Sequence, residues 1–206
     1  MKAQALLIFT KNLIFGNVKT RLAATVSNEV AFTVYKQLVQ HTISVTDCLP
    51  VDKIVFYSEQ IDERDMWSND IYEKQLQAGK DLGERIHNAF HQVFNKGYSK
   101  AVIIGTDCPE LTSGIIMSAF VYLNNHDVVI GPARDGGYYL LGMKKLHTEL
   151  FRNINWSSDK VLQQTLTACR QLFLSTHLLP ELSDIDDEND LKNSTKQFLL
   201  KHYEHD

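Results

Sequence analysis

Residues 101–110 read Ala-Val-Ile-Ile-Gly-Thr-Asp-Cys-Pro-Glu, an apolar run that stops at a glycine and then turns polar. Four consecutive apolar residues without polar alternation predict a strand covered on both faces, as in the middle of a parallel sheet. In such sheets, ligands bind beyond the carboxyl ends of the strands. Asp107 therefore stands where a functional carboxylate is expected.

Similar apolar runs recur along the chain and alternate with amphipathic patterns. We predict strands at residues 5–9, 53–57, 127–130 and 138–141 and near residues 172–174. We predict helices at residues 28–46, from about residue 81 to a stop at Gly97, at 115–123, at 161–169 and at 191–203. This order predicts an α/β fold with a mostly parallel sheet and helices on both faces.

Length and composition indicate one globular domain over residues 1–206, since there is no repeat or Pro/Gly linker. The formal net charge of −4 argues against a nucleic-acid partner. Three scattered cysteines form no zinc pattern and suit reduced thiols. The apolar run at residues 5–9 is too short for a signal peptide or a membrane span. We therefore expect a cytoplasmic protein.

A basic loop follows the first predicted strand. Lys11, Lys19 and Arg21 are its cations, and Gly16 would let the backbone approach an oxyanion. The loop is no Walker A motif, because Gly16 lies three residues before Lys19. It predicts either a phosphate-binding loop or a solvated surface loop whose charges face water.

Asp107 is the first candidate metal ligand. A carboxylate at the end of a buried strand can hold Mg²⁺ or Mn²⁺, which prefer oxygen ligands. The alternative is a turn or capping aspartate ahead of the helix that starts near Thr112.

Residues 131–139 read Gly-Pro-Ala-Arg-Asp-Gly-Gly-Tyr-Tyr. An Asp-Gly pair between two apolar runs is the usual sign of a hairpin turn. The same loop also offers a pocket wall, in which Gly136, Gly137 and Tyr138 contact a substrate ring. Asp135 is the candidate general base for an acceptor hydroxyl.

Two further segments carry candidate ligands. Residues 183–191 hold a run of acidic side chains that could bind metal or cap the terminal helix, although their spacing does not fit an EF-hand. Gly79, Asp81 and Gly83 open the most amphipathic helix, whose free N–H groups could meet a base or phosphate. Asp81 as an ordinary N-cap is the alternative.

Taken in order, these motifs resemble the DUF2064 family, also called radical-SAM/selenodomain-associated transferase 1. The matching segments are Gly…Lys-Thr-Arg-Leu at 16–22, Asp-Leu-Gly-Glu-Arg at 81–85, Gly-Thr-Asp-Cys-Pro at 105–109, Gly-Pro-Ala-x-Asp-Gly-Gly-Tyr-Tyr-Leu at 131–140, Asn-Trp-Ser at 155–157 and Asp-Ile-Asp-x-Glu-x-Asp-Leu at 184–191. The resemblance runs from about residue 6 to residue 191. One departure is that Leu13 and Ile14 stand where the family usually has proline.

The resemblance implies a GT-A, nucleotide-diphospho-sugar transferase fold: a Rossmann-like three-layer α/β domain with a mostly parallel central sheet. It implies that Lys19 and Arg21 face phosphates and that Asp107 holds a metal, with Asp186 near a second metal-ligand position. It also places Asp135 beside the acceptor or metal and adds Trp156, from the Asn-Trp-Ser motif, to the expected substrate contacts.

Three functions stay open at this point. The family points to glycosyl transfer from a nucleotide-sugar donor to a small acceptor, with Mg²⁺ or Mn²⁺. The three cations favour a nucleotidyltransferase that uses a triphosphate and releases pyrophosphate. A non-catalytic nucleotide-binding module would keep Lys19 and Arg21 but would not need Asp107.

Overall fold

The computed structural model describes residues 4–198 and contains one seven-stranded sheet. In sheet order β3-β2-β1-β4-β6-β5-β7, the strands are Tyr72–Leu76, Asp52–Tyr57, Gln4–Thr10, Lys100–Ile104, Tyr138–Met143, Val128–Pro132 and Thr176–Leu178. Within the described residues, only β6 runs antiparallel to its neighbours. The predicted mostly parallel α/β fold is confirmed.

The central strand β1 shows why its sequence lacks polar alternation. Leu6 and Ile8 pack into the core on one face of the sheet, whereas Ala5 and Leu7 pack into the core on the other face. All four are completely buried. Both faces of a central strand exclude water, so every position favours an apolar side chain.

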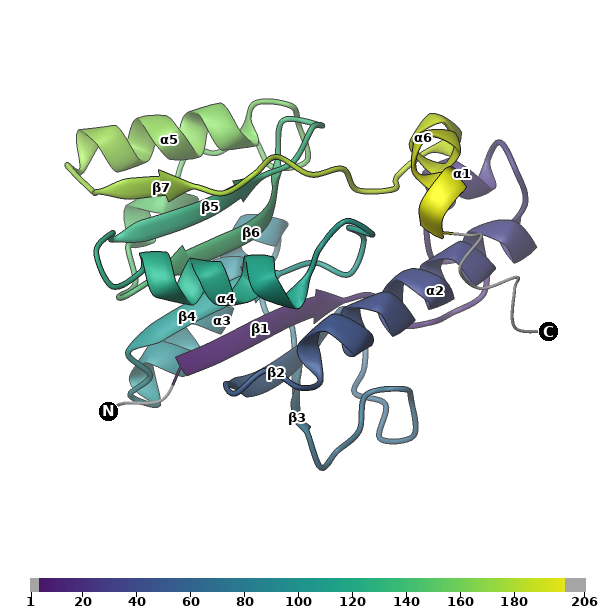
Figure 1. Cartoon of the computed structure of the whole chain (residues 1–206), viewed down its shortest axis with the longest axis horizontal. Coiled ribbons are helices and arrows are strands. Elements are labelled where there is room, and N and C mark those ends of the chain that lie inside the picture. Colours follow the sequence, from purple (N-terminus) through teal and green to yellow (C-terminus); the bar gives the residue numbers. More distant parts are fainter. Residues whose placement is uncertain (1–3, 199–206) are drawn as a thin grey trace.

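Helices cover both faces of the sheet (Figure 1). On one side lie α2 (Asn28–Thr46) and α4 (Ser113–Tyr122). On the other lie α3 (Leu82–Asn95), α5 (Val161–Gln171) and the short 3₁₀ helix η1 (Thr148–Phe151). A third small core joins α1 (Thr20–Ala23), α2 and α6 (Glu188–Phe198) above the carboxyl ends of β1 and β4.

One predicted strand is wrong, one strand was missed, and the last helix begins earlier than predicted. The strand expected near residues 172–174 is wrong. Leu172 is the C-cap of α5, Phe173 has a left-handed backbone with φ of 53° and is 95% exposed, and β7 begins only at Thr176. The edge strand β3 was not predicted, because its Tyr-Glu-Lys-Gln-Leu sequence lacks an apolar run. The last helix begins at Glu188, and residues 199–203 of the predicted 191–203 segment lie outside the described range.

The three cysteines are free thiols, and Cys108 and Cys169 are buried. Among residues 4–198, no helix is long and apolar enough to cross a bilayer.

Candidate active site

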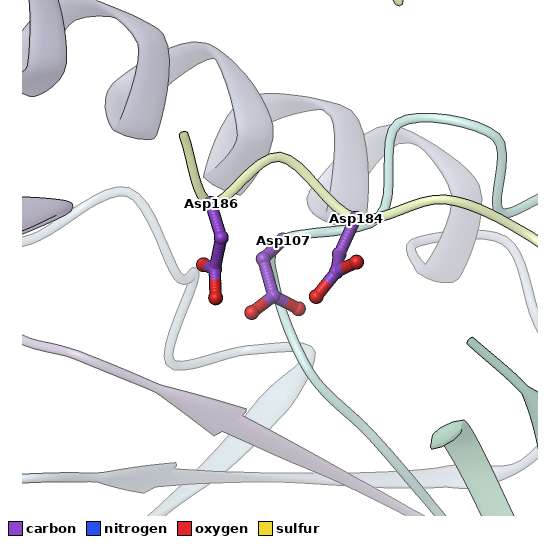
Figure 2. A group of neighbouring side chains, drawn as sticks. All are labelled: Asp107, Asp184 and Asp186. Atoms are coloured by element: carbon purple, nitrogen blue, oxygen red, sulfur yellow. The ribbon is translucent and has the colours of Figure 1, made fainter. Parts of the chain in front are cut away.

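Three carboxylates meet beyond the carboxyl end of β4. One oxygen each from Asp107, Asp184 and Asp186 lies within 4.8 Å of the other two. Figure 2 shows the three side chains converging from two chain segments, the loop after β4 and the approach to α6. Between the two later aspartates, Ile185 is completely buried, and its backbone N–H donates to the Asp107 carbonyl at 3.0 Å. This anchor places Asp184 and Asp186 on one side of the chain.

A buried cation, Lys19, holds two of these carboxylates. Its Nζ donates to Asp186 Oδ1 at 2.8 Å and lies 3.6 Å from Asp107 Oδ2. Lys19 caps α1 with a left-handed backbone (φ 47°) and is 8% exposed. Arg21 is much more exposed, and its Nη1 lies 3.8 Å from Asp186 Oδ2. In this structure Lys19 therefore contacts carboxylates, and its expected contact with phosphate stays a prediction.

The electrostatics of the cluster suit a divalent cation. Burial, together with the negative charges of Asp107, Asp135 and Asp186, raises the pKa of Asp184 to about 7. Burial alone would lower the pKa of Lys19, but the negative charges of Asp107 and Asp186 raise it above its usual value. Burial alone would likewise raise the pKa of Asp186, but the positive charge of Lys19 lowers it. Lys19 pairs with Asp107 and Asp186 and Arg21 with Asp186, whereas no described cation pairs with Asp184. Three carboxylates that supply oxygen donors within reach of one another fit Mg²⁺ or Mn²⁺.

Tyr35 of α2 joins the basic loop after β1, which carries Lys19, to the loop after β4, which carries Asp107. Its hydroxyl accepts from the Lys11 backbone N–H at 2.8 Å and lies 3.0 Å from Thr106 Oγ1. Tyr35 is 2% exposed, so these bonds form away from water. The end of β1 and the end of β4 are thereby held at a fixed separation.

The loop around Asp135 fits both interpretations of its sequence. It is a hairpin turn between β5 and β6, in which Asp135 Oδ1 accepts from the Gly137 N–H at 2.8 Å. It also borders the site, since Asp135 lines the same cavity as the three carboxylates. Gly136 has φ of 88°, and a Cβ there would stand 2.2 Å from the Asp159 carbonyl. Glycine is therefore needed for the close approach of the loop at Asp159.

Trp156 packs over the start of α3. A Cβ at Gly83 would lie 2.1 Å from the Trp156 Nε1, so the glycine makes room for the indole. Asp81 is the N-cap of α3 and accepts from the Glu84 N–H at 2.9 Å. Gly79 has φ of 146° and turns the chain into this cap. These contacts shape the edge of the site.

Two adjoining cavities open on the carboxylate cluster. The first, of about 470 Å³, is lined by Asp135, Gly137, Asp184, Arg21 and Trp156. The second, of about 430 Å³, is lined by Phe9, Gln77, Arg85 and Ile103. Both are lined by Lys11, Lys19, Asp107, Asp186, Tyr138 and Tyr139. Gly16, Gly79, Asp81, Gly83 and Gly136 line neither cavity, and their contact with substrate stays a prediction.

Gln77 was not singled out from the sequence, and Asp184 and Arg85 entered only as members of longer motifs, without a role of their own. Asp184 could have been found, because Asp184 and Asp186 flank the apolar Ile185 at a spacing of two, which puts both on one side of an extended chain. No comparable pattern marks Gln77.

Comparison with known proteins identifies the family. The sequence matches the DUF2064 family model, described as an uncharacterized protein conserved in bacteria, over residues 41–158. The chain belongs to the DUF2064 family. The predicted resemblance is therefore confirmed. No relative is found among curated proteins.

Solved structures extend the comparison over nearly the whole DUF2064 chain. A protein from Desulfovibrio desulfuricans G20, provisionally described as a nucleotide-diphospho-sugar transferase, is 30% identical, with a TM-score of 0.87 over 99% of this chain and 96% of its own. Its similarity confirms the nucleotide-diphospho-sugar transferase fold.

Two more distant structures share the fold at low identity. A CMP:2-keto-3-deoxy-manno-octonic acid synthetase complexed with CTP is 9% identical, with a TM-score of 0.55 over 98% of this chain and 99% of its own. Rv0371c from Mycobacterium tuberculosis H37Rv, in complex with manganese, is 11% identical. Its TM-score is 0.59, over 95% of this chain and 99% of its own.

Proposed function

We propose that this DUF2064 protein is a metal-dependent transferase that moves a glycosyl group from a nucleotide diphosphate sugar to a small acceptor. The observation that carries the proposal is the cluster of Asp107, Asp184 and Asp186 in the first cavity, of which Asp107 and Asp186 also line the second. That arrangement suits a donor in one cavity, an acceptor in the other and the bond to be broken at the carboxylates. The transferase fold of the relatives and the manganese complex of Rv0371c support it.

The residues divide by role. Asp107, Asp184 and Asp186 would hold Mg²⁺ or Mn²⁺, and the bound cation would offset negative charge on the departing diphosphate. Lys19 orients Asp107 and Asp186 through the ion pairs described above. Lys11 and Arg21 supply positive charge to the donor phosphates. Asp135 accepts the proton of the acceptor hydroxyl.

Nucleotidyl transfer is the second candidate, because Lys11, Lys19 and Arg21 all line the first cavity with the carboxylates. Three cations suit a triphosphate, and the CTP complex of the synthetase gives a precedent on the same fold. A phosphorylated acceptor is already anionic, so this reaction needs no base at Asp135.

Product analysis separates the two reactions. The protein is incubated with Mn²⁺ and either nucleotide sugars or bare triphosphates, and slow donor hydrolysis is followed without an acceptor. Nucleoside diphosphate from a nucleotide sugar supports glycosyl transfer. Pyrophosphate from a triphosphate, with nucleotide sugars inert, refutes it in favour of nucleotidyl transfer. Nucleotide binding that is indifferent to Mn²⁺ and to Asp107→Ala would instead indicate a non-catalytic module.

We propose that residues 1–206 form a single GT-A-like transferase domain in the cytoplasm. One sheet carries both cavities, and the free thiols suit a reducing compartment.

A further inference from the structure

Two histidines meet away from the carboxylate cluster, beside the edge of the sheet. His126 lies just before β5, at the amino end of this strand, and His177 lies in the edge strand β7. The centroids of the two imidazole rings are 5.1 Å apart, and the ring planes are inclined by 49°. Both residues are half-buried, and neither lines the two cavities of the candidate active site. The pair is therefore separate from the proposed transferase machinery.

The ring of His126 is held in one orientation by the end of α4. Its Nδ1 lies 3.1 Å from the Tyr122 carbonyl oxygen, which also accepts from the His126 backbone N–H at 3.0 Å. Because a carbonyl can only accept, Nδ1 carries the proton of the neutral ring, and the lone pair is on Nε2. Metal-binding histidines commonly donate their other ring N–H to a backbone carbonyl in this way. The contact with Tyr122 thus prepares Nε2 of His126 as a ligand.

His177 is fixed against the same tyrosine. Its ring stacks on the Tyr122 ring, with centroids 3.6 Å apart and planes 18° from parallel. Its backbone is placed beside Val129 by the pairing of β7 with β5. Neither ring nitrogen of His177 has a hydrogen-bond partner within residues 4–198. Burial and the charge of His126 lower the pKa of His177, which favours the neutral ring that binds metal.

The separation of the rings is that of two imidazoles on one metal ion. With Zn–N bonds of about 2.0–2.1 Å and tetrahedral angles, the centroids of two such rings stand about 5 Å apart. Imidazole nitrogens suit Zn²⁺, Ni²⁺ and Cu²⁺, whereas Mg²⁺ and Mn²⁺ prefer oxygen ligands. The neighbouring carboxylate of Asp127 is already occupied by Ser175 and Lys144, so it does not compete for the two rings.

We infer that His126 and His177 form a binding site for a divalent cation that prefers nitrogen ligands, Zn²⁺ before all, with water in the remaining positions. The ion would join the end of α4 to β7, which pairs with only one neighbour among the described strands. Tyr122 and His177 also line an open groove between α4 and β7, through which the ion can enter from solvent. The inference does not depend on the proposed function.

Titration of the full chain with Zn²⁺ tests the inference, with Mg²⁺ in large excess to compete for the carboxylate cluster. In two-dimensional NMR, Zn²⁺ should shift the imidazole resonances of His126 and His177, which are assigned by their loss in the variants. By calorimetry, His126→Gln and His177→Gln should each bind Zn²⁺ at least about tenfold more weakly than the wild type. Loss of a ligand costs at least as much as loss of a group that supports one, which is about 10–100-fold.

A second histidine pair provides the matched control. His87 and His91 lie four positions apart on α3, with ring centroids 6.2 Å apart. Both ring nitrogens of His87 already have partners, Asn88 Oδ1 at 3.1 Å and Thr148 Oγ1 at 3.2 Å. His91→Gln should therefore leave the affinity for Zn²⁺ unchanged. Thermal melting checks that each variant is folded, and His126→Gln carries the test alone if His177→Gln is not.

Three results overturn the inference. The wild type binds no Zn²⁺, or a folded His126→Gln or His177→Gln variant binds it as tightly as the wild type, or His91→Gln loses as much affinity as they do. Each of these leaves the proposed transferase standing, because the pair lies outside both cavities.

Discussion

Replacing Lys19 with methionine tests the electrostatic design of the carboxylate cluster. Methionine keeps most of the buried stem and the unbranched shape but removes the ammonium group that contacts Asp186 at 2.8 Å and Asp107 at 3.6 Å. The backbone strain at φ 47° is the same for both residues, so the change isolates the charge.

The magnitude follows from burial. Removing one partner of a fully buried ion pair costs about 3–5 kcal/mol. The Asp107 and Asp186 side chains are 41% and 42% exposed, so water screens much of the resulting repulsion. We expect Lys19→Met to lower the free energy of unfolding by about 1–2 kcal/mol and Tm by about 2–8 °C.

Manganese should reverse this loss. Without Lys19, the three carboxylates have no buried counter-charge, so they should bind Mn²⁺ more tightly than in the wild type. A cation at 100 times its Kd adds about 2.7 kcal/mol to the stability of the native state. The rise in Tm with Mn²⁺ should therefore be larger for Lys19→Met than for the wild type, as followed by differential scanning calorimetry.

Lys74→Met is the matched control. Lys74 is also buried and paired, with its Nζ 2.9 Å from Asp65 Oδ1, but this pair lies at β3 and not at the carboxylate cluster. Lys74→Met should lower the free energy of unfolding, and Mn²⁺ should raise its Tm no more than it raises that of the wild type. Equal recovery of both variants, or no greater Mn²⁺ stabilisation of Lys19→Met than of the wild type, would refute the reasoning.

Three further predictions concern single positions. The pKa of Asp184 is raised to about 7, so below that pH its carboxyl is mostly protonated and must lose the proton to bind metal. The affinity for Mn²⁺, measured by calorimetry, should therefore rise between about pH 6 and pH 8. Asp184→Asn should flatten this pH dependence. Gly83→Ala should lower the free energy of unfolding in urea by about 1–3 kcal/mol because its Cβ meets Trp156, whereas Gly114→Ala, with only Thr112 Oγ1 nearby at 3.8 Å, should not destabilise; equal effects contradict the packing argument. Asp135→Asn should lower turnover by about 100-fold or more while donor affinity changes little, and unchanged turnover would remove Asp135 as the base.

Much of the fold could be predicted because its signals are local. The buried strands β1, β2 and β4 each contain a continuous apolar run, and the predicted helix at residues 28–46 has the bounds of α2. The edge strands β3 and β7 were not predicted for a physical reason. Within residues 4–198 each pairs with a neighbour on one side only, so neither needs an apolar run. Their strand state is set by pairing with β2 and β5.

For the site, the sequence by itself determined that Asp107 follows a buried strand, that a basic loop follows the first strand and that an acidic run precedes the last helix. Each of these is a property of neighbouring residues. Only the tertiary structure decided that Lys19 pairs with Asp186, which is 167 positions away, and that Asp184 joins the cluster. Which loops meet is fixed by strand order, and strand order depends on long-range backbone pairing that no local pattern encodes.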